Sequence, residues 1–263
     1  MLSSLVESCD RSTPLVSSSS TRETTSLRLI LKCSLSPGDI VVMTAAVRDL
    51  QLAYPGRFLV DVRTSAREIW ENNSYLTPLD DDDPEVRTLE LHCPLIHESN
   101  QRPYHFIHAF AQHLGHQLGL PIPQTRFNGD IHISALEKTW MSQVEETGFL
   151  GRFWIIVAGG KYDYTAKWWN PAHAQAVVDH FRGRILFVQC GESGHWHPRL
   201  DGALDLIGKT DLRQFIRLIY HSDGVLCPVN PPLHEHDQTG RRHSEDRDVL
   251  RRGEPPIQRL CRD

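Results

Sequence analysis

The sequence lacks several features that would assign it quickly to a class of protein. No apolar run approaches the roughly 20 residues that a membrane-spanning helix requires, and the N-terminus has no apolar core of a secretory signal peptide. We therefore expect no transmembrane segment and a cytoplasmic location. The formal net charge is only −5 over 263 residues. Such a small charge provides no bulk attraction to nucleic acid, so no nucleic-acid partner is expected.

Paired cysteines and the common nucleotide-binding fingerprints are also missing. The six cysteines lie at long intervals, without the CxxC spacing of zinc and redox sites. We interpret them as reduced thiols, because a chain of this length does not need disulfides to fold. The sequence contains no GxGxxG, no GxxxxGK[ST] and no Gly-x-Ser-x-Gly. Dinucleotide-binding, P-loop and serine-hydrolase interpretations therefore lack their usual motifs.

The chain as a whole is 40% hydrophobic and 23% charged, as in ordinary globular proteins, but its two ends differ in composition from the rest. Residues 1–27 contain nine serines and four threonines, and we predict a disordered leader there. Residues 230–263 contain seven arginines but no lysine and no aromatic residue. We predict a divergent, disordered tail, and hypothesise that a frameshift or similar disruption replaced the natural C-terminus.

Between these ends the sequence predicts two successive α/β blocks. Residues 28–150 open with a strand at 27–32, a helix at 40–54 and a second, buried strand at 58–62, which is the order of a Rossmann-like unit. Residues 151–229 repeat the pattern, with strands expected at 153–158, 185–189, 204–206 and 224–229 and helices at 171–181 and 211–221. We expect an α/β fold with two Rossmann-like domains, the second truncated, joined near residues 135–152 and separated by a cleft.

Polar residues follow several of the expected strands, where open α/β sheets bind their ligands. Asp39 lies in a strand-to-helix loop, although it could instead cap a helix beginning at Ile40. Lys167 follows a glycine-containing loop, and a flexible ammonium suits phosphate binding, but a surface lysine is the alternative. Glu192 comes just after the strand at 185–189 and could equally be a loop carboxylate.

Two segments contain residue types that bind metals. Asp81 to Asp83 include a DxD pattern, but the acidic run 80–83 adjoins Pro84 and reads better as a solvated loop. His195 and His197 lie near Cys190 without a third ligand at convincing spacing. We therefore expect no metal site.

Several of these segments resemble family 9 glycosyltransferases, which include heptosyltransferases. The stretch from Ser36 to Leu50, followed by Tyr54-Pro55-Gly56, looks like the N-terminal signature of that family. The segment from Ala158-Gly159-Gly160 to Lys167-Trp168-Trp169 resembles the opening of its nucleotide-binding domain. Residues 206–213 resemble its G-x-T/S-x-L step. The resemblance runs over about residues 28–229, with a trace at His234.

The chain departs from the family after residue 229. The family has an acidic or small residue, a glycine and a histidine there, followed by an alanine-rich helix. Here prolines stand before His234, and no helical pattern follows. The resemblance is therefore to a C-terminally incomplete member.

The resemblance implies a GT-B fold and an inverting, metal-independent transfer of a sugar, for example a heptose. The donor would be a nucleotide-diphosphate sugar, with no other cofactor, and the acceptor a glycan or a lipid-linked glycan. The family pattern implies Asp39 as catalytic base and Lys167 as phosphate ligand. It also implies donor contacts from the remaining candidates, which are Thr165, Glu192 (to the base or ribose), Thr210, Asp211 and His234.

Two other interpretations remain open from the sequence. The altered C-terminal region is compatible with a non-catalytic remnant, or with a binding module that holds nucleotide-sugars but lacks an intact donor site. An α/β protein that binds some other nucleotide is also possible, since no fingerprint excludes it.

Overall fold

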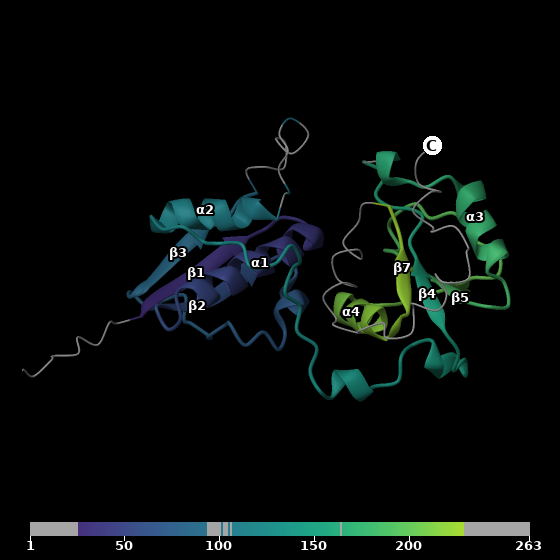
Figure 1. The fold of residues 1–263 in the computed structure, drawn as a ribbon, viewed down its shortest axis with the longest axis horizontal. Helices are drawn as coiled ribbons and strands as arrows, with labels where there is room; N and C mark the ends of the chain where they lie inside the picture. Colours follow the sequence, from purple (N-terminus) through teal and green to yellow (C-terminus); the bar gives the residue numbers. More distant parts are fainter. Residues whose placement is uncertain (1–25, 94–100, 102–104, 106, 164, 229–263) are drawn as a thin grey trace, which may run out of the picture.

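Two parallel β-sheets organise the described part of the chain (Figure 1). The computed structural model describes residues 26–93, 101, 105, 107–163 and 165–228. The predicted leader up to residue 25, the predicted tail and His234 lie outside the described residues. Each sheet carries its own helices and hydrophobic core. The α/β class predicted from the sequence is confirmed.

The first sheet has three parallel strands in the order β2-β1-β3. They are β1 (Leu27–Cys33), β2 (Phe58–Thr64) and β3 (Val86–Glu90). The last of these was not anticipated, because only Val86 and Leu89 are apolar in it. Alternate residues of β1, namely Leu29, Leu31 and Cys33, face the core.

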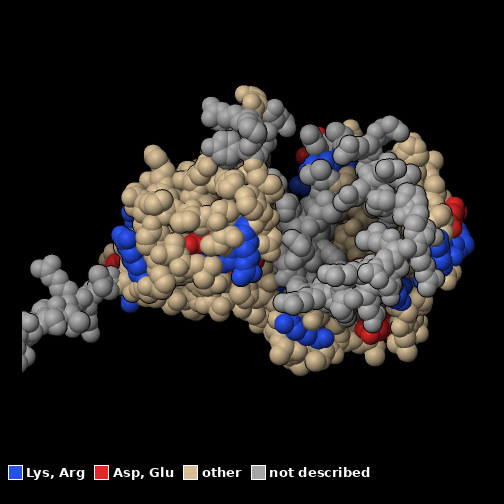
Figure 2. Space-filling view, viewed as in Figure 1, with Lys and Arg blue, Asp and Glu red and all other residues tan. Residues whose placement is uncertain are grey.

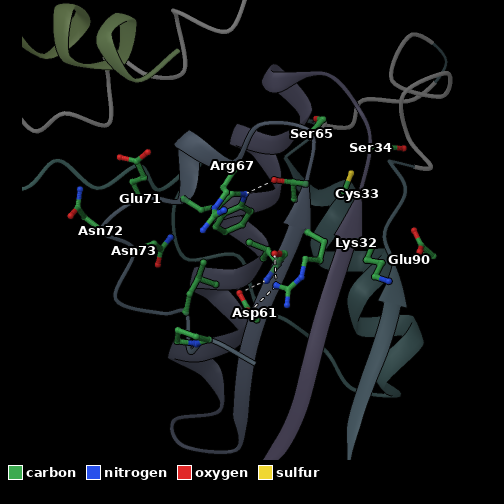
Figure 3. Close-up of a pocket in the computed structure, with 16 residues that line it drawn as sticks. Lys32, Cys33, Ser34, Asp61, Ser65, Arg67, Glu71, Asn72, Asn73 and Glu90 are labelled. Atoms are coloured by element: carbon green, nitrogen blue, oxygen red, sulfur yellow. Dashed lines mark hydrogen bonds and ion pairs between the residues drawn. The ribbon is translucent and has the colours of Figure 1, made fainter. Parts of the chain in front are cut away.

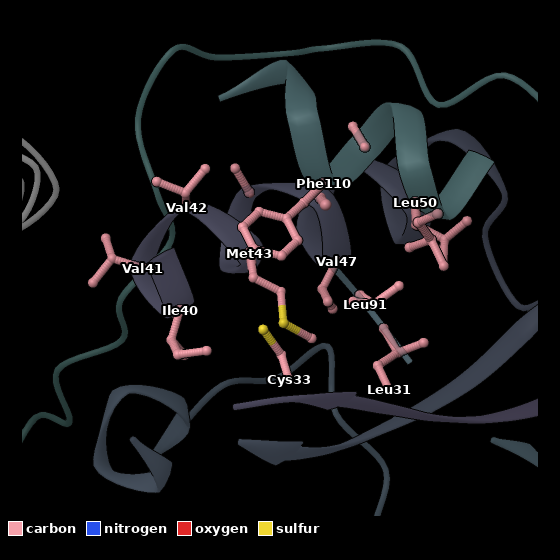
Figure 4. Packing of buried hydrophobic residues seen from close by; sticks show 14 of the residues in the cluster. Leu31, Cys33, Ile40, Val41, Val42, Met43, Val47, Leu50, Leu91 and Phe110 are labelled. Atoms are coloured by element: carbon pink, nitrogen blue, oxygen red, sulfur yellow. The ribbon is translucent and has the colours of Figure 1, made fainter. Parts of the chain in front are cut away.

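Two helices, α1 (Pro37–Ala53) and α2 (His108–Leu118), pack side by side against this sheet. Figure 4 shows Phe110 of α2 beside Met43 of α1, with Cys33 and Leu31 of the sheet beneath them. Phe110 and Met43 are fully buried. Burial of an apolar side chain of this size contributes about 1.5–3 kcal/mol, so this layer supplies much of the stability of the first block.

Helix α1 begins three residues earlier than the sequence pattern indicated. Ser36 is the N-cap, Pro37 occupies the first turn and Asp39 lies in that turn. The prediction that Asp39 could cap a helix beginning at Ile40 is therefore wrong. Proline is favoured at this point because its fixed φ suits a helix and its missing N–H would have had no partner there.

The second sheet has four parallel strands in the order β6-β5-β4-β7. They are β4 (Phe153–Ile156), β5 (Leu186–Gln189), β6 (Leu204–Asp205) and β7 (Gly224–Leu226). Helix α3 (Pro171–His180) covers one face, and α4 (Leu212–His221) covers the other (Figure 1). Successive side chains of β4 point to opposite faces of the sheet, and both faces are apolar. Phe153 and Ile155 pack with α4, while Ile156 packs with α3.

Short 3-10 turns connect the larger elements. They are η1 (Arg67–Trp70), η2 (Glu137–Thr139), η3 (Glu145–Thr147) and η4 (Thr165–Lys167). Within the described residues, no helix is long and apolar enough to cross a membrane. On the face shown in Figure 2, the first block carries separate groups of charged atoms and no continuous basic surface.

A buried ion pair anchors the loop after α2 to the side of α1. Arg48 and Asp49 are almost fully buried, and their side chains lie 3.0 Å apart. The guanidinium of Arg48 also donates to three backbone carbonyls between residues 126 and 129. Asp49 accepts from the side chains of Gln124 and Thr125. Both charges are therefore satisfied without water.

We predict that Arg48→Met strongly destabilises the fold. The substitution leaves the buried Asp49 carboxylate without its counter-charge, and breaking a buried pair in this way costs about 3–5 kcal/mol. Urea unfolding of the full chain measures the effect. Arg199→Met is the control, because that side chain is 94% exposed. If Arg48→Met lowered the free energy of unfolding no more than the control does, the anchoring role would be contradicted.

Candidate functional site

The carboxyl ends of the parallel strands bring together residues that are distant in the sequence. In a parallel sheet every strand ends at the same edge, and ligands of open α/β sheets bind just outside it. The first sheet ends there at Cys33, Thr64 and Glu90. The second ends at Ile156, Gln189, Asp205 and Leu226. A ligand could therefore bind at either edge.

A cavity of about 1000 Å³ opens at the carboxyl edge of the first sheet. Its wall includes the ends of β1 and β2, the end of β3 at Glu90, and the segment from Arg67 to Asn73 (Figure 3). The volume is large enough for a ligand of several sugar rings or a nucleotide. This cavity was not predicted from the sequence, although Asp61, Arg63 and Thr64 in the second half of β2 are polar residues in an otherwise apolar strand.

Ion pairs arrange the charged side chains in this cavity. Asp61 lies 2.9 Å from Arg63, and Arg63 lies 2.9 Å from Asp81. Burial opposes ionisation of Asp61, but hydrogen bonds from the Leu79 and Val62 amides and from Arg63 outweigh it and lower the Asp61 pKa. The Asp61 hydrogen bond raises the Arg63 pKa. Asp81 belongs to the acidic run 80–83, which was predicted to be a solvated loop. Through its ion pair with Arg63, it helps to hold one side chain of the cavity wall.

One wall residue presents an unused hydrogen-bond donor. Asn73 is 8% exposed, and its Oδ1 accepts from the Tyr75 amide at 2.9 Å. Its Nδ2 has no hydrogen-bond partner among the described residues. A buried amide without a partner is costly, so a ligand oxygen in the cavity would relieve that cost.

Asp39 lies in the first turn of α1, near this edge. The Ser36 hydroxyl donates to its Oδ2 at 2.7 Å, and the carboxylate is half-buried. Burial raises the pKa of the Cys33 thiol, and the negative charges of Asp39 and Glu90 add to that rise. Asp39 is close enough to Cys33 to influence it, but it is not among the residues that line the cavity.

At the second sheet, several candidate residues from the sequence follow neighbouring strands. Thr165 and Lys167 are exposed on η4 after β4, Glu192 follows β5 and Thr210 follows β6. These strands are adjacent in the order β6-β5-β4, so the loops share one edge. Their roles in donor binding remain predictions, as does that of His234, which lies outside the described residues.

Asp211 has a structural role at the start of α4. Its carboxylate accepts from the Gln214 amide at 2.7 Å, and the Gln214 side chain accepts from the Asp211 amide at 2.9 Å. This reciprocal arrangement is a capping box. The cap fixes the start of α4 at Leu212, with Thr210 immediately before the capping residue.

A strap of residues 192–197 crosses the ends of β4 and β5. Trp196 pairs with Gly160 through two backbone hydrogen bonds of 2.9 and 3.1 Å. The rings of Trp168 and Trp196 stack at 4.3 Å. A Cβ on Gly159 would lie 1.9 Å from the Trp196 carbonyl oxygen. The glycines after β4 therefore allow the strap to approach the sheet closely.

The strap also explains the histidines that were considered as metal ligands. His197 Nε2 lies 3.1 Å from the Glu192 carbonyl oxygen, and His195 Nε2 lies 3.4 Å from the Glu192 carboxylate. Burial raises the pKa of the Cys190 thiol to about 12, so it is not a thiolate. In the part of the chain that the structure describes, no group of three or more potential ligands could hold a metal.

Solved structures of family 9 glycosyltransferases share this fold. A glycosyl transferase family 9 protein from Veillonella parvula is 13% identical, with a TM-score of 0.59 over 81% of this chain and 78% of that one. ADP-heptose lipopolysaccharide heptosyltransferase II from E. coli is 14% identical, with a TM-score of 0.53 over 81% and 82%. E. coli heptosyltransferase WaaC with ADP is 14% identical, with a TM-score of 0.52 over 81% and 85%.

No family model matches the chain, and no curated protein is similar to it in sequence. The structural likeness shows the GT-B fold of family 9, as the resemblance implied.

We predict that Gly159→Ala displaces the strap. The new methyl group would meet the backbone of Trp196, which cannot rotate away, and overpacking of this kind costs about 1–3 kcal/mol. Urea unfolding and tryptophan fluorescence report the change. Gly194→Ala is the matched control, because a Cβ there has nothing within 4 Å. Equal stability of the two variants would show that the strap does not need this close approach.

Proposed function

We propose that the chain is a glycosyltransferase that moves a sugar, for example a heptose, from a nucleotide-diphosphate donor to a glycan or lipid-linked acceptor. The observation that supports it most is the shared edge of β6, β5 and β4, where Lys167, Glu192 and Thr210 follow adjacent strands. The large cavity at the corresponding edge of the first sheet supports a separate acceptor site. The fold of heptosyltransferases, one of them solved with ADP, agrees with this proposal.

In the proposed reaction, the donor diphosphate lies against the second sheet. The Lys167 ammonium and the Thr165 hydroxyl bind the phosphate oxygens, and Glu192 binds the ribose or base. Lys167 also stabilises the negative charge that develops when the bond between the anomeric carbon and the diphosphate oxygen breaks. The leaving electron pair remains on that oxygen. A lysine suits this role because its charge is compact and its stem is flexible.

The acceptor hydroxyl attacks the same anomeric carbon from the opposite face, which inverts the configuration. Asp39 removes the proton of that hydroxyl as general base. The Asn73 amide, which has no partner in the cavity wall, would donate to another oxygen of the acceptor. In this proposal protein groups carry the charge of the leaving diphosphate, so no metal enters the reaction.

We predict that one of ADP, GDP and UDP binds saturably to the full chain, and that Lys167→Ala weakens this binding at least about tenfold. Calorimetric titration measures the affinity. Lys138→Ala is the control, because it removes the same charge from η2, in the segment that joins the two blocks. Binding that is unchanged in Lys167→Ala would contradict the phosphate role. Absence of binding by any of the three in the folded chain would instead favour the non-catalytic remnant.

Asp39→Asn should leave nucleotide affinity unchanged and lower turnover by about 100-fold or more, as expected for loss of a general base. Nucleotide release from the matching nucleotide-sugar, with a glycan acceptor, measures turnover. Asp179→Asn is the control, since that residue lies on α3 and pairs with Arg182. Weakened nucleotide binding with normal turnover in Asp39→Asn would exclude the base assignment.

A further inference from the structure

Helix α4 packs against hydrophobic cores of both blocks. Its residues Leu218 and Ile219 belong to the core beneath the second sheet. Ile216 belongs to the core of the first block, and Leu212 packs against that core. The helix therefore follows the second sheet in sequence but is held by both blocks.

The first turn of α4 carries a charged side chain into this contact. Arg213 is 11% exposed and makes two hydrogen bonds, of 2.6 and 2.8 Å, to the carboxylate of Glu137, which is 7% exposed. The same guanidinium donates to the carbonyl oxygens of His132 at 2.7 Å and Glu68 at 3.2 Å. A fork-to-fork arrangement of this kind fixes direction as well as distance.

Glu137 extends this contact towards the first-block cavity. Its Oε2 also accepts from Asn72 Nδ2 at 3.0 Å. Asn72 has a φ of 61°, the left-handed conformation that asparagine tolerates better than most residues. Asn72 and Glu71 both line the cavity, and the Glu71 carboxylate lies 3.4 Å from Arg213. A continuous set of polar contacts thus runs from α4 to the cavity wall.

The electrostatics favour an ionised pair. Burial would raise the pKa of Glu137, but hydrogen bonds from Arg213 and Ser134 outweigh it and lower the pKa to about 2. The Glu137 carboxylate therefore stays ionised well above pH 2, opposite the permanently charged guanidinium of Arg213. A buried ionic pair is weak evidence for added stability, but it can specify one arrangement among alternatives.

The other end of the contact lies at the edge of the second sheet. Arg213 follows Asp211, which caps α4, and Thr210 precedes that cap on the edge where we place the donor. We propose that Arg213 and Glu137 are positioning residues that hold the donor-side start of α4 against the wall of the acceptor-side cavity. The positioning of α4 follows from the contacts above, while its value for sugar transfer rests on the proposed function.

The chain supplies a matched control for Glu137. Ser134 and Glu137 exchange hydrogen bonds of 2.8 and 3.1 Å across a short turn. Ser142 and Glu145 make the same reciprocal pair, at 2.7 and 3.2 Å, in the next turn of the linker. Glu137→Gln and Glu145→Gln therefore perturb the same local motif, but only Glu137 bonds to Arg213.

Hydrogen exchange of the full chain tests the proposal, first without ligand. In Glu137→Gln and Arg213→Gln, the amides of residues 67–73 and 212–218 should exchange at least about tenfold faster than in the wild type. Strands β1 and β5 should exchange at the wild-type rate. The effect of the double variant should be clearly smaller than the sum of the two single effects, because the Arg213–Glu137 interaction is already lost in each single variant. Unchanged exchange at residues 67–73, or the same acceleration in Glu145→Gln, would overturn the positioning role.

A second arm adds saturating ADP, GDP or UDP and separates this proposal from the proposed function. In the wild type, the nucleotide that binds should slow exchange at residues 207–210 and also at residues 67–73. In Glu137→Gln it should slow only residues 207–210. Protection of residues 207–210 alone in the wild type would overturn the link between the sites. If no nucleotide slowed exchange in either segment, the proposed function would be contradicted. The measurement without ligand would still test whether Arg213 and Glu137 position α4.

Discussion

The parallel direction of the strands is the constraint on which the rest of the structure depends. It places the ends of β4, β5 and β6 at one edge, although the loops that follow them lie between residues 157 and 210. The same constraint gathers the ends of β1, β2 and β3 around the first-block cavity. Without it, Lys167, Glu192 and Thr210 would be unrelated surface residues. Strand direction therefore gives each block one edge at which loops can bind a ligand, and these are the edges where we propose the donor and the acceptor.

Buried charges determine how the two blocks and their loops are held. Arg48 ties the loop at residues 126–129 to α1, and Arg213 ties α4 to the linker and to η1. In each case one guanidinium satisfies a carboxylate and several backbone carbonyls at once. Arginine suits such positions because its fork of donors is rigid and remains charged when buried. The hydrophobic cores provide the stability, and these pairs select the arrangement.

The sequence predicted the elements with strong apolar patterns and missed features that depend on distant contacts. Strands β4 and β5 and helix α4 agree with the expected segments, because the strands are short apolar runs and the helix has its apolar residues at helical spacing. Strand β3 was missed because three of its five residues are polar. The cavity residue Asn73 and the Arg213–Glu137 pair could not be found, since their partners lie far away along the chain. His197 packs against Gly159 and Gly191, and His195 lies beside the Glu192 carboxylate, contacts that the sequence pattern of the two histidines did not reveal.

We propose that the edge of the second sheet binds a nucleoside diphosphate. The most direct measurement is a crystal structure of the full chain with the nucleotide that binds in titration. We expect its diphosphate within hydrogen-bonding distance of Lys167 Nζ, with the ribose or base beside Glu192. A nucleotide bound in the first-block cavity, or at a surface remote from β4, β5 and β6, would contradict the account.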